Sequence, residues 1–259
     1  MRCVVLGAGN VAWSLAPALD DAGVEVVQIW SRTVSKSEKL AARIPGSSVA
    51  RKLDEIIPDA DLYILAVHDD AIASIASALG YRGGLWVHTS GSVDASALST
   101  VTDTYGVLYP LQTFSHGHLT DLETVPVYVE GNNPDTELRI ECIARAISSD
   151  VKLADTPRRR KLHAAAVFAC NFTNHMWAIA DRLLRESGSD LSVLYPLIEE
   201  TSRKAMAMPP ADAQTGPARR GDLRVMQGHI EALSPDDARI YRLISNDIMK
   251  SFGHECDKL

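Results

Sequence analysis

The sequence contains few cysteines and no long apolar run. Its four cysteines, Cys3, Cys142, Cys170 and Cys256, form no CxxC pair among the 259 residues, which argues against a disulfide framework and against a zinc site. No apolar run reaches the roughly 20 residues of a membrane span, and MRCVVLGAGN leads directly into a strand-like segment instead of a signal peptide. We therefore expect a cytoplasmic protein that does not bind membranes.

Positive charge is also in short supply. Lys and Arg number 26 against 33 Asp and Glu, a formal net charge of −7, so a broad electrostatic contact with nucleic acid is not expected. The pair of histidines in His116-Gly117-His118 has no third ligand nearby in the sequence, and we predict no metal site. With 46% hydrophobic and 23% charged residues, the composition is that of a globular protein with one large domain or two small ones.

Two parts of the chain differ in pattern, and we place the boundary near Asp155. Residues 1–155 alternate short apolar runs with helical patterns, which predicts a doubly wound α/β domain with a largely parallel sheet. The predicted strands are Cys3–Leu6, Val24–Trp30, Asp61–Val67, Leu85–Thr89, Tyr105–Tyr109, Val125–Val129 and Val151–Ala154. The predicted helices between them are Val11–Ala22, Lys36–Ile44, Ala71–Leu79 and Thr136–Ser148.

Residues 156–259 predict an all-α domain for substrate binding or dimerisation. Four helices are expected, and PPADAQTGPARRGD between the second and third is predicted to be a loop. Ser234 is expected to cap the last helix, with Pro235 in its first turn. The predicted helices are Leu162–Glu186, Leu191–Met208, Asp222–Leu233 and Pro235–Phe252.

A glycine-rich turn between the first strand and the first helix points to a dinucleotide. It reads Gly7-Ala8-Gly9-Asn10-Val11-Ala12, the pattern G-x-G-x-x-A. Gly7 permits the tight turn, Gly9 lets a pyrophosphate approach the backbone, and Ala12 keeps the helix close to the strand. The N–H groups of Asn10 and Val11 open the helix, whose N-terminus favours phosphate. The alternative is a glycine turn in a doubly wound fold that binds no nucleotide.

The end of the second predicted strand favours NADP over NAD. An NAD site usually has an acidic residue there to bind the ribose diol, whereas this chain has Ser31, Arg32 and Thr33, followed by Lys36. Hydroxyl and cationic groups suit a 2′-phosphate. The alternative is that Arg32 is a solvated loop residue.

Two later strand ends should lie at the same edge of the sheet, because ligands of open α/β sheets bind outside the carboxyl ends of the strands. One carries Ala66, Val67 and His68, which we assign to the cofactor site. The next carries His88 and Ser90, and Ser90 is a candidate hydrogen-bond donor to the substrate. Either histidine could instead have a structural role.

The long helix predicted from Leu162 has a polar stripe. At about 100° per residue, the stripe contains His163, Val167, Cys170, Asn174, Trp177 and Asp181, with Asn171 at its border. Neither Lys nor Glu occurs between His163 and Ile179, which is unusual for a solvated face. We interpret His163 as the proton donor in a hydride transfer and Asn171 as a group that orients the substrate. The alternative is a solvent-facing stripe.

Two arginine-containing segments remain. Thr215-Gly216-Pro217-Ala218-Arg219-Arg220-Gly221-Asp222 could bind a carboxylate, contact a partner subunit, or simply cap the next helix through Asp222. Arg158-Arg159-Arg160-Lys161 is interpreted as a solvated charge cluster, and the alternative is a position near the cofactor phosphates.

Several motifs together resemble one family: GAGNVA, SRT, AVHDDAI, HTSGS, YPLQTFS, HAAAVFACNFTNH and TGPARRGD. It is the family of Rossmann-like proteins whose C-terminal half is a helical domain of unknown function. More broadly, the chain is similar to pyrroline-5-carboxylate reductase, the deazaflavin-dependent NADP oxidoreductases and the 6-phosphogluconate dehydrogenase superfamily. The resemblance implies an NADP-binding domain, a helical domain that completes the site, and a dimer built through the helices.

One position departs from that superfamily. Its β-hydroxyacid dehydrogenases have a lysine one turn before the asparagine of the long helix, where this chain has Val167, so the lysine-based mechanism does not carry over. The hypothesis is an NADP-dependent reductase of a small carbonyl or imine compound, with ketopantoate, a 2-oxo acid, as one candidate. The alternative is a non-catalytic NADP-binding redox sensor or regulatory protein.

Overall fold

The computed structural model describes residues 1–115 and 117–255, so His116 and Cys256 lie outside the described residues. Contacts divide the chain into two compact units, unit 1 (Met1–Asn171) and unit 2 (Phe172–Leu259). The domain boundary near Asp155 stays a prediction. The helix that follows it packs into unit 1, where Leu162 contacts a cluster of buried residues from the sheet. Within the described part of the chain, no helix is both long enough and apolar enough to cross a membrane.

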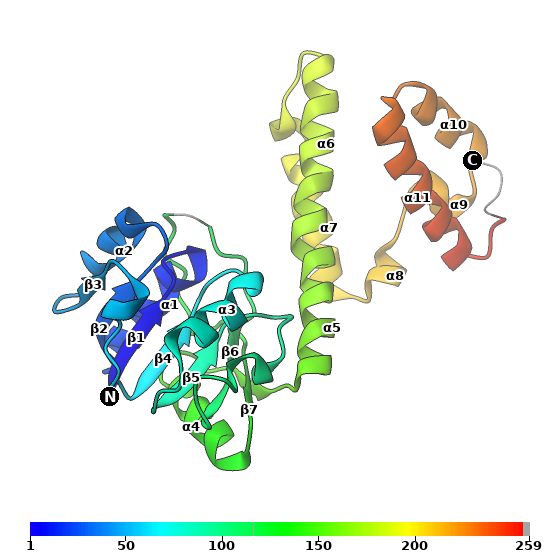
Figure 1. The fold of residues 1–259 in the computed structure, drawn as a ribbon. Helices are drawn as coiled ribbons and strands as arrows, with labels where there is room; N and C mark the ends of the chain where they lie inside the picture. Colours follow the sequence, from blue (N-terminus) through cyan, green and yellow to red (C-terminus); the bar gives the residue numbers. More distant parts are fainter. Residues whose placement is uncertain (116, 256–259) are drawn as a thin grey trace. The chain divides into compact units, whose positions relative to one another are not determined.

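Unit 1 is built on an eight-stranded sheet with the order β3-β2-β1-β4-β5-β6-β7-β8 (Figure 1). Among the described strands, β6 and β7 pair antiparallel and the other neighbours pair parallel. The first six positions have the strand order of dinucleotide-binding folds, which confirms the predicted doubly wound sheet. The strands are β1 (Arg2–Leu6), β2 (Glu25–Trp30), β3 (Ser48–Ala50), β4 (Leu62–Leu65), β5 (Leu85–His88), β6 (Tyr105–Pro110), β7 (Val127–Gly131) and β8 (Val151–Leu153).

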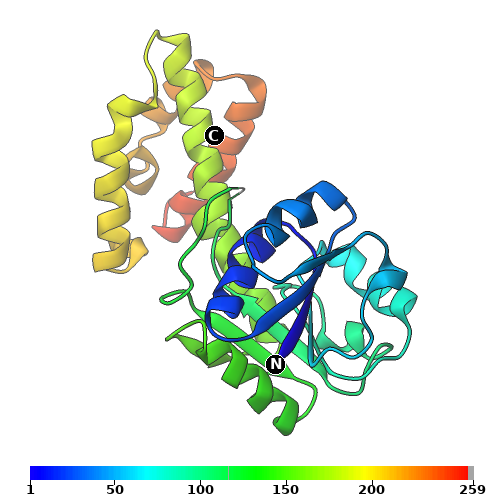
Figure 2. The same cartoon turned by 90° about the vertical axis from the view of Figure 1, so that its left-hand side faces the viewer.

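Helices cover both faces of this sheet because successive strand residues point to opposite sides. Cys3 and Val5 pack with one set of helices, α1, α2 and α4, while Val4 and Leu6 pack on the other face with α3. Figure 2 shows the sheet between these two layers. The helices are α1 (Asn10–Asp21), α2 (Val34–Ala41), α3 (Asp69–Leu79), α4 (Pro134–Arg145) and α5 (Thr156–Ala166).

Three details of the sequence prediction were wrong. The strand β3 was not predicted, since three residues carry too little alternation to be recognised. The helix predicted over Leu162–Glu186 begins earlier, at Thr156, and is interrupted by π-helix at Val167–Phe172 before α6 (Thr173–Glu186). The segment predicted as a loop contains two single-turn helices, α8 (Pro210–Ala213) and α9 (Pro217–Arg220), because proline is favourable in a first helical turn.

Unit 2 is entirely helical in its described part. Besides α6, α8 and α9 it has α7 (Tyr195–Ala207), α10 (Leu223–Glu231) and α11 (Pro235–Ser251). Ser234 caps α11 and Asp222 caps α10, as predicted. Its fully buried apolar core is small and centres on Met226 and Met249, and an ion pair between Arg182 and Asp237 joins α6 to α11.

Candidate functional site

The turn between β1 and α1 has two glycines with different tasks. Gly7 has a φ of 120°, and a Cβ there would lie 2.1 Å from the carbonyl oxygen of Ala66. No other residue can replace Gly7 without moving the end of β4. Gly9 precedes α1 with an ordinary φ of −86°, and a Cβ there would meet no atom within 4 Å. The chain's own packing therefore does not require a glycine at this position, and the open space beside it suits a pyrophosphate at a helix N-terminus.

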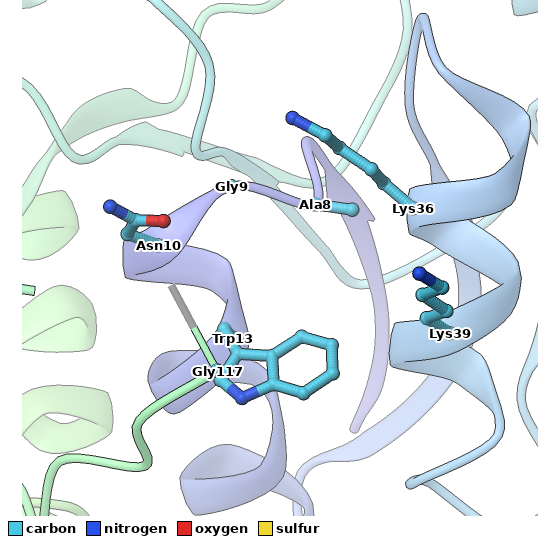
Figure 3. Close-up of a pocket in the computed structure, with 7 residues that line it drawn as sticks. All are labelled: Ala8, Gly9, Asn10, Trp13, Lys36, Lys39 and Gly117. Carbon is cyan, nitrogen blue, oxygen red and sulfur yellow. The ribbon is translucent and has the colours of Figure 1, made fainter. Parts of the chain in front are cut away.

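A cationic cavity lies beside Gly9. Lys36 and Lys39 of α2 line it together with Trp13 of α1 (Figure 3). Neither ammonium group makes an ion pair within the described chain. The predicted Arg32 and Thr33 are exposed and follow β2 directly, and the hydroxyl of Ser31 accepts a hydrogen bond from the Thr33 N–H at 3.3 Å. Lys36 and Lys39 thus place two positive charges beside the glycine turn.

Other predicted cofactor residues have structural contacts of their own. Asn10 donates from its side-chain amide to the carbonyl oxygen of Phe114 at 2.9 Å, which ties the loop after β6 to α1. Val11 packs on the core, and Ala12, also on α1, is fully buried. The Asn10 bond thus links the start of α1 to Phe114.

The carboxyl ends of neighbouring strands meet at one edge of the sheet. The Ala66 N–H donates to the Leu6 carbonyl at 2.8 Å, and the Thr89 N–H donates to the Leu65 carbonyl at 3.2 Å. Val67 lies against Gly7, and the exposed His68 precedes α3. The predicted residues after β1, β4 and β5 are thus neighbours at this edge.

Ser90 lies in the turn after β5 and is buried. Its Oγ accepts hydrogen bonds from the N–H groups of Ser92 and Val93, each at 3.0 Å. Its own N–H donates to Nδ1 of His88 at 3.2 Å. Burial, aided by the charge of Arg159, lowers the pKa of His88 to about 4, so this histidine is neutral at pH 7 and can accept that bond. His88 is therefore a structural residue of the turn.

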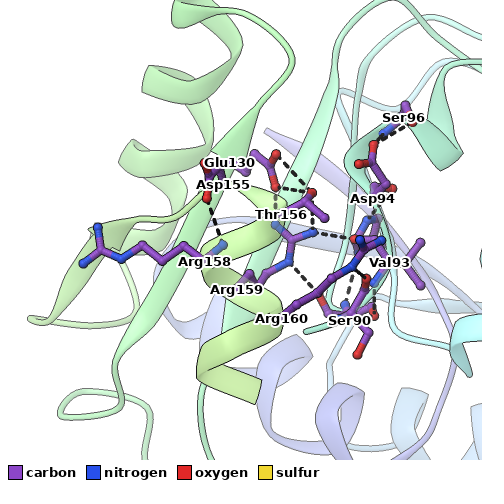
Figure 4. A network of polar contacts seen from close by, with 12 residues as sticks. Ser90, Val93, Asp94, Ser96, Glu130, Asp155, Thr156, Arg158, Arg159 and Arg160 are labelled. Carbon is purple, nitrogen blue, oxygen red and sulfur yellow. Dashed lines mark hydrogen bonds and ion pairs between the residues drawn. The ribbon is translucent and has the colours of Figure 1, made fainter. Parts of the chain in front are cut away.

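A buried arginine holds the same turn against α5 (Figure 4). Arg159 is 0% exposed; its Nε donates to the Ser90 carbonyl at 3.1 Å, and its guanidinium also contacts the Val93 carbonyl. It forms an ion pair with Glu130 of β7, and the Thr156 hydroxyl bridges the two side chains. The interpretation of residues 158–161 as a solvated cluster was wrong for Arg159, because α5 starts early enough to turn this side chain inward.

His163 of α5 lies beside the turn as well. Its Nδ1 is 3.0 Å from the hydroxyl oxygen of Tyr109 on β6. A Cβ on Gly91 would be 2.8 Å from the imidazole ring, so the ring packs directly on the backbone next to Ser90. Two of the three predicted catalytic residues, His163 and Ser90, are thereby brought together from distant parts of the sequence.

Asn171, the third predicted catalytic residue, is exposed in the π-helical segment. The wider π-turn does not keep the 100° spacing on which the predicted stripe depended. Asp181, for example, accepts a hydrogen bond from the Leu191 N–H and pairs with Arg185. The single stripe from His163 to Asp181 is therefore not a property of the folded helix.

The chain matches known families along most of its length. Residues 2–87 match the family "NADP oxidoreductase coenzyme F420-dependent", and residues 125–248 match "Domain of unknown function (DUF2520)". A "putative NADP oxidoreductase" from Bacteroides fragilis is 38% identical, with a TM-score of 0.90 over 96% of this chain and 98% of that one. The chain belongs to this NADP oxidoreductase family.

More distant solved structures share the fold of this oxidoreductase. A reductive aminase from Aspergillus terreus, in complex with NADPH and ethyl-5-oxohexanoate, is 15% identical with a TM-score of 0.72 over 98% of this chain and 96% of that one. An imine reductase from Streptomyces aurantiacus is 16% identical with a TM-score of 0.63 over 100% and 98%. Among curated proteins, none matches the sequence.

Sequence reasoning missed four residues of this oxidoreductase's candidate site. Lys39 follows Lys36 at helical spacing, so a helical projection from Lys36 could have found it. Tyr109 was part of a recognised motif but received no role. Arg159 was noted only as part of a basic run and Glu130 was not noted at all, since their pairing depends on the packing of α5 against β7.

Proposed function

We propose that this NADP oxidoreductase reduces the C=O or C=N bond of a small anionic compound, for which a 2-oxo acid such as ketopantoate is one candidate. When bound, NADPH supplies the hydride. The observation that supports the proposal most directly is the placement of His163 and Ser90 together beside the carboxyl ends of β5 and β6. The glycine turn, Ala66, Val67 and His68 line the same edge of the sheet and would hold the cofactor.

Each candidate residue has a chemical task in this proposal. The His163 imidazole donates a proton to the substrate heteroatom as the hydride arrives at carbon. The Asn171 amide orients the substrate, and the Ser90 hydroxyl, whose oxygen already accepts two backbone N–H groups, retains one proton to donate. Residues 156–259 carry 15 Lys and Arg against 13 Asp and Glu. This slight excess of positive charge favours the helical part of the chain as the place where an anionic substrate binds.

The test combines cofactor binding with turnover. Saturating NADPH should raise the melting temperature, since a ligand of the native state at 100 times its Kd adds about 2.7 kcal/mol of stability. NADPH oxidation should then be observed with at least one member of a panel of 2-oxo acids, including ketopantoate, and cyclic imines. Stabilisation without turnover of any compound would indicate the non-catalytic redox sensor instead. An unchanged melting temperature would contradict nucleotide binding altogether.

Arg32 is proposed to bind the 2′-phosphate of NADPH together with Ser31, Thr33 and Lys36. The Arg32→Ala variant should weaken NADPH binding by about 10- to 100-fold, because a charged hydrogen bond contributes about 1.5–3 kcal/mol, while NADH binding changes little. Isothermal titration calorimetry with NADPH and with NADH measures the ratio of the two Kd values. The Arg139→Ala variant removes the same charge from an exposed site on α4 and should leave the ratio unchanged. Equal losses for both cofactors would contradict the assignment.

We also propose a homodimer formed through unit 2, with a second copy as the partner. Large apolar side chains are exposed on its helices, among them Met206 on α7 at 83% and Leu243 on α11 at 74%. An apolar groove of about 290 Å³ runs between α6 and α11. Light scattering should give a dimer mass for the wild type and a monomer mass for Leu243→Glu. The Asp247→Asn variant, on the same helix, should remain dimeric, and a monomeric wild type would refute the proposal.

A cytoplasmic location completes the proposal. Cys3, Cys142 and Cys170 are free thiols, and burial raises the pKa of the Cys3 thiol. Free thiols are typical of a reducing compartment.

A further inference from the structure

Tyr109 is placed to control His163. It lies near the carboxyl end of β6 and is only 8% exposed. Besides the 3.0 Å contact between its hydroxyl and Nδ1 of His163, the two rings meet edge to face, with centroids 6.1 Å apart and an angle of 69° between their planes. A buried hydroxyl so positioned can form a well-directed hydrogen bond with the imidazole.

The other contacts of the imidazole restrict its rotation. The ring packs on the backbone at Gly91, where even one added carbon would clash. That backbone is itself fixed, because Arg159 binds the Ser90 carbonyl and Arg160 donates to the Ser92 carbonyl at 2.7 Å. Leu162, the residue before His163, packs against the buried cluster that contains Tyr109 and Tyr128. Turning the ring over would therefore break the Tyr109 contact.

Tyr109 can serve both protonation states of the ring. Burial raises the pKa of Tyr109 to about 12, so its phenol keeps its proton at neutral pH. A hydroxyl donates to Nδ1 when the imidazole is neutral and accepts from Nδ1–H when the imidazole is protonated. In either state Nδ1 is occupied by Tyr109, while Nε2 makes no hydrogen bond with any residue in the described part of the chain.

We propose that Tyr109 is a positioning residue that tethers Nδ1 of His163 and thereby makes Nε2 the nitrogen that transfers the proton. The catalytic part rests on the proposed function. In that reaction, the Nδ1–H of the protonated ring stays hydrogen-bonded to the Tyr109 oxygen. The Nε2–H bond breaks, and its proton bonds to the substrate oxygen or nitrogen that gains negative charge on hydride transfer. The ring is left neutral and takes a new proton from water. The tether itself is a property of the protein without substrate.

The Tyr109→Phe variant tests the tether, since it removes only the hydroxyl. In protein with ¹⁵N-labelled histidine at acidic pH, the wild type should show a downfield Nδ1–H resonance of His163, identified by its loss in His163→Gln. This resonance should disappear in Tyr109→Phe, because an untethered imidazolium proton exchanges rapidly with water. The matched control is Tyr128→Phe, which removes a hydroxyl from an equally buried tyrosine paired with Tyr109 across β6 and β7, and it should retain the resonance.

Kinetics with an accepted substrate test the catalytic part. We expect Tyr109→Phe to lower kcat about 3- to 10-fold, the effect of losing one hydrogen bond, with the KM for NADPH unchanged. A resonance that persists in Tyr109→Phe would overturn the tether, and equal losses of kcat in Tyr109→Phe and Tyr128→Phe would overturn the positioning role. If the wild type reduces no compound, the proposed function fails, while the resonance still decides whether Tyr109 tethers His163.

Discussion

The His163→Gln variant is expected to lower kcat by about 10²- to 10⁴-fold, the range typical for loss of a general acid. Glutamine can still donate a hydrogen bond to a substrate but cannot deliver a proton. The side chain lies on α5 beside Ser90 and Tyr109 rather than on the glycine turn. The Kd for NADPH should therefore stay within about twofold of the wild type, a change of less than RT. Steady-state kinetics measure kcat, and a cofactor titration measures the Kd for NADPH.

A second histidine provides the control. His229 of α10 also pairs through Nδ1 with a tyrosine hydroxyl, that of Tyr241, at 2.8 Å and with an edge-to-face ring contact. It belongs to unit 2, and His229→Gln should keep kcat near the wild-type value. Near-normal turnover in His163→Gln would remove His163 from the chemistry. Comparable losses in both variants would indicate a general effect of losing a histidine–tyrosine pair.

The Arg159→Met variant is expected to destabilise unit 1 by about 3–5 kcal/mol, the cost of breaking a buried ion pair by removing one partner. Methionine fills similar space but leaves the Glu130 carboxylate without its cation and two carbonyl groups without their donor. The Glu130→Gln exchange in the Arg159→Met background should recover part of the loss, because the uncompensated charge is gone. Urea unfolding of the wild type and of these two variants measures the differences in the free energy of unfolding.

Position in the fold, rather than loss of an arginine, should determine that cost. Arg145 pairs with Glu141 four residues earlier on α4, and its side chain is 56% exposed. Arg145→Met should therefore cost only about 0.3–0.5 kcal/mol, as exposed helical pairs do. Similar costs for Arg145→Met and Arg159→Met would show that the Arg159 network does not stabilise the turn after β5.

Local patterns made much of the fold predictable. The alternation of apolar runs and helical segments predicted seven of the eight strands and the doubly wound fold class, because central strands such as β1, β4 and β5 are buried apolar runs. Gly7 could be assigned from sequence because the left-handed turn and the close approach to Ala66 are requirements of a few consecutive residues. The caps Ser234 and Asp222 could be predicted for the same reason, since a cap acts within three residues.

The π-turn at Val167–Phe172 could not be predicted in this way. Helical periodicity assumes a constant rotation per residue, and no residue in VFACNF is a known signal for a wider turn. The prediction of a single polar stripe failed for that reason, although His163, which precedes the π-turn, kept its place near Ser90.

By itself, the sequence determined the doubly wound sheet, the glycine turn with its preference for a phosphate, and the helical second part, because the pattern of each element and the order of strands and helices can be read from short stretches of the chain. Only the tertiary structure decided that Arg159 is buried against Glu130 and that Tyr109 meets His163. Those partners lie 29 and 54 positions apart in the chain, and no local periodicity encodes contacts over such separations. They form only when α5 packs against the sheet, which places the groups proposed for proton transfer.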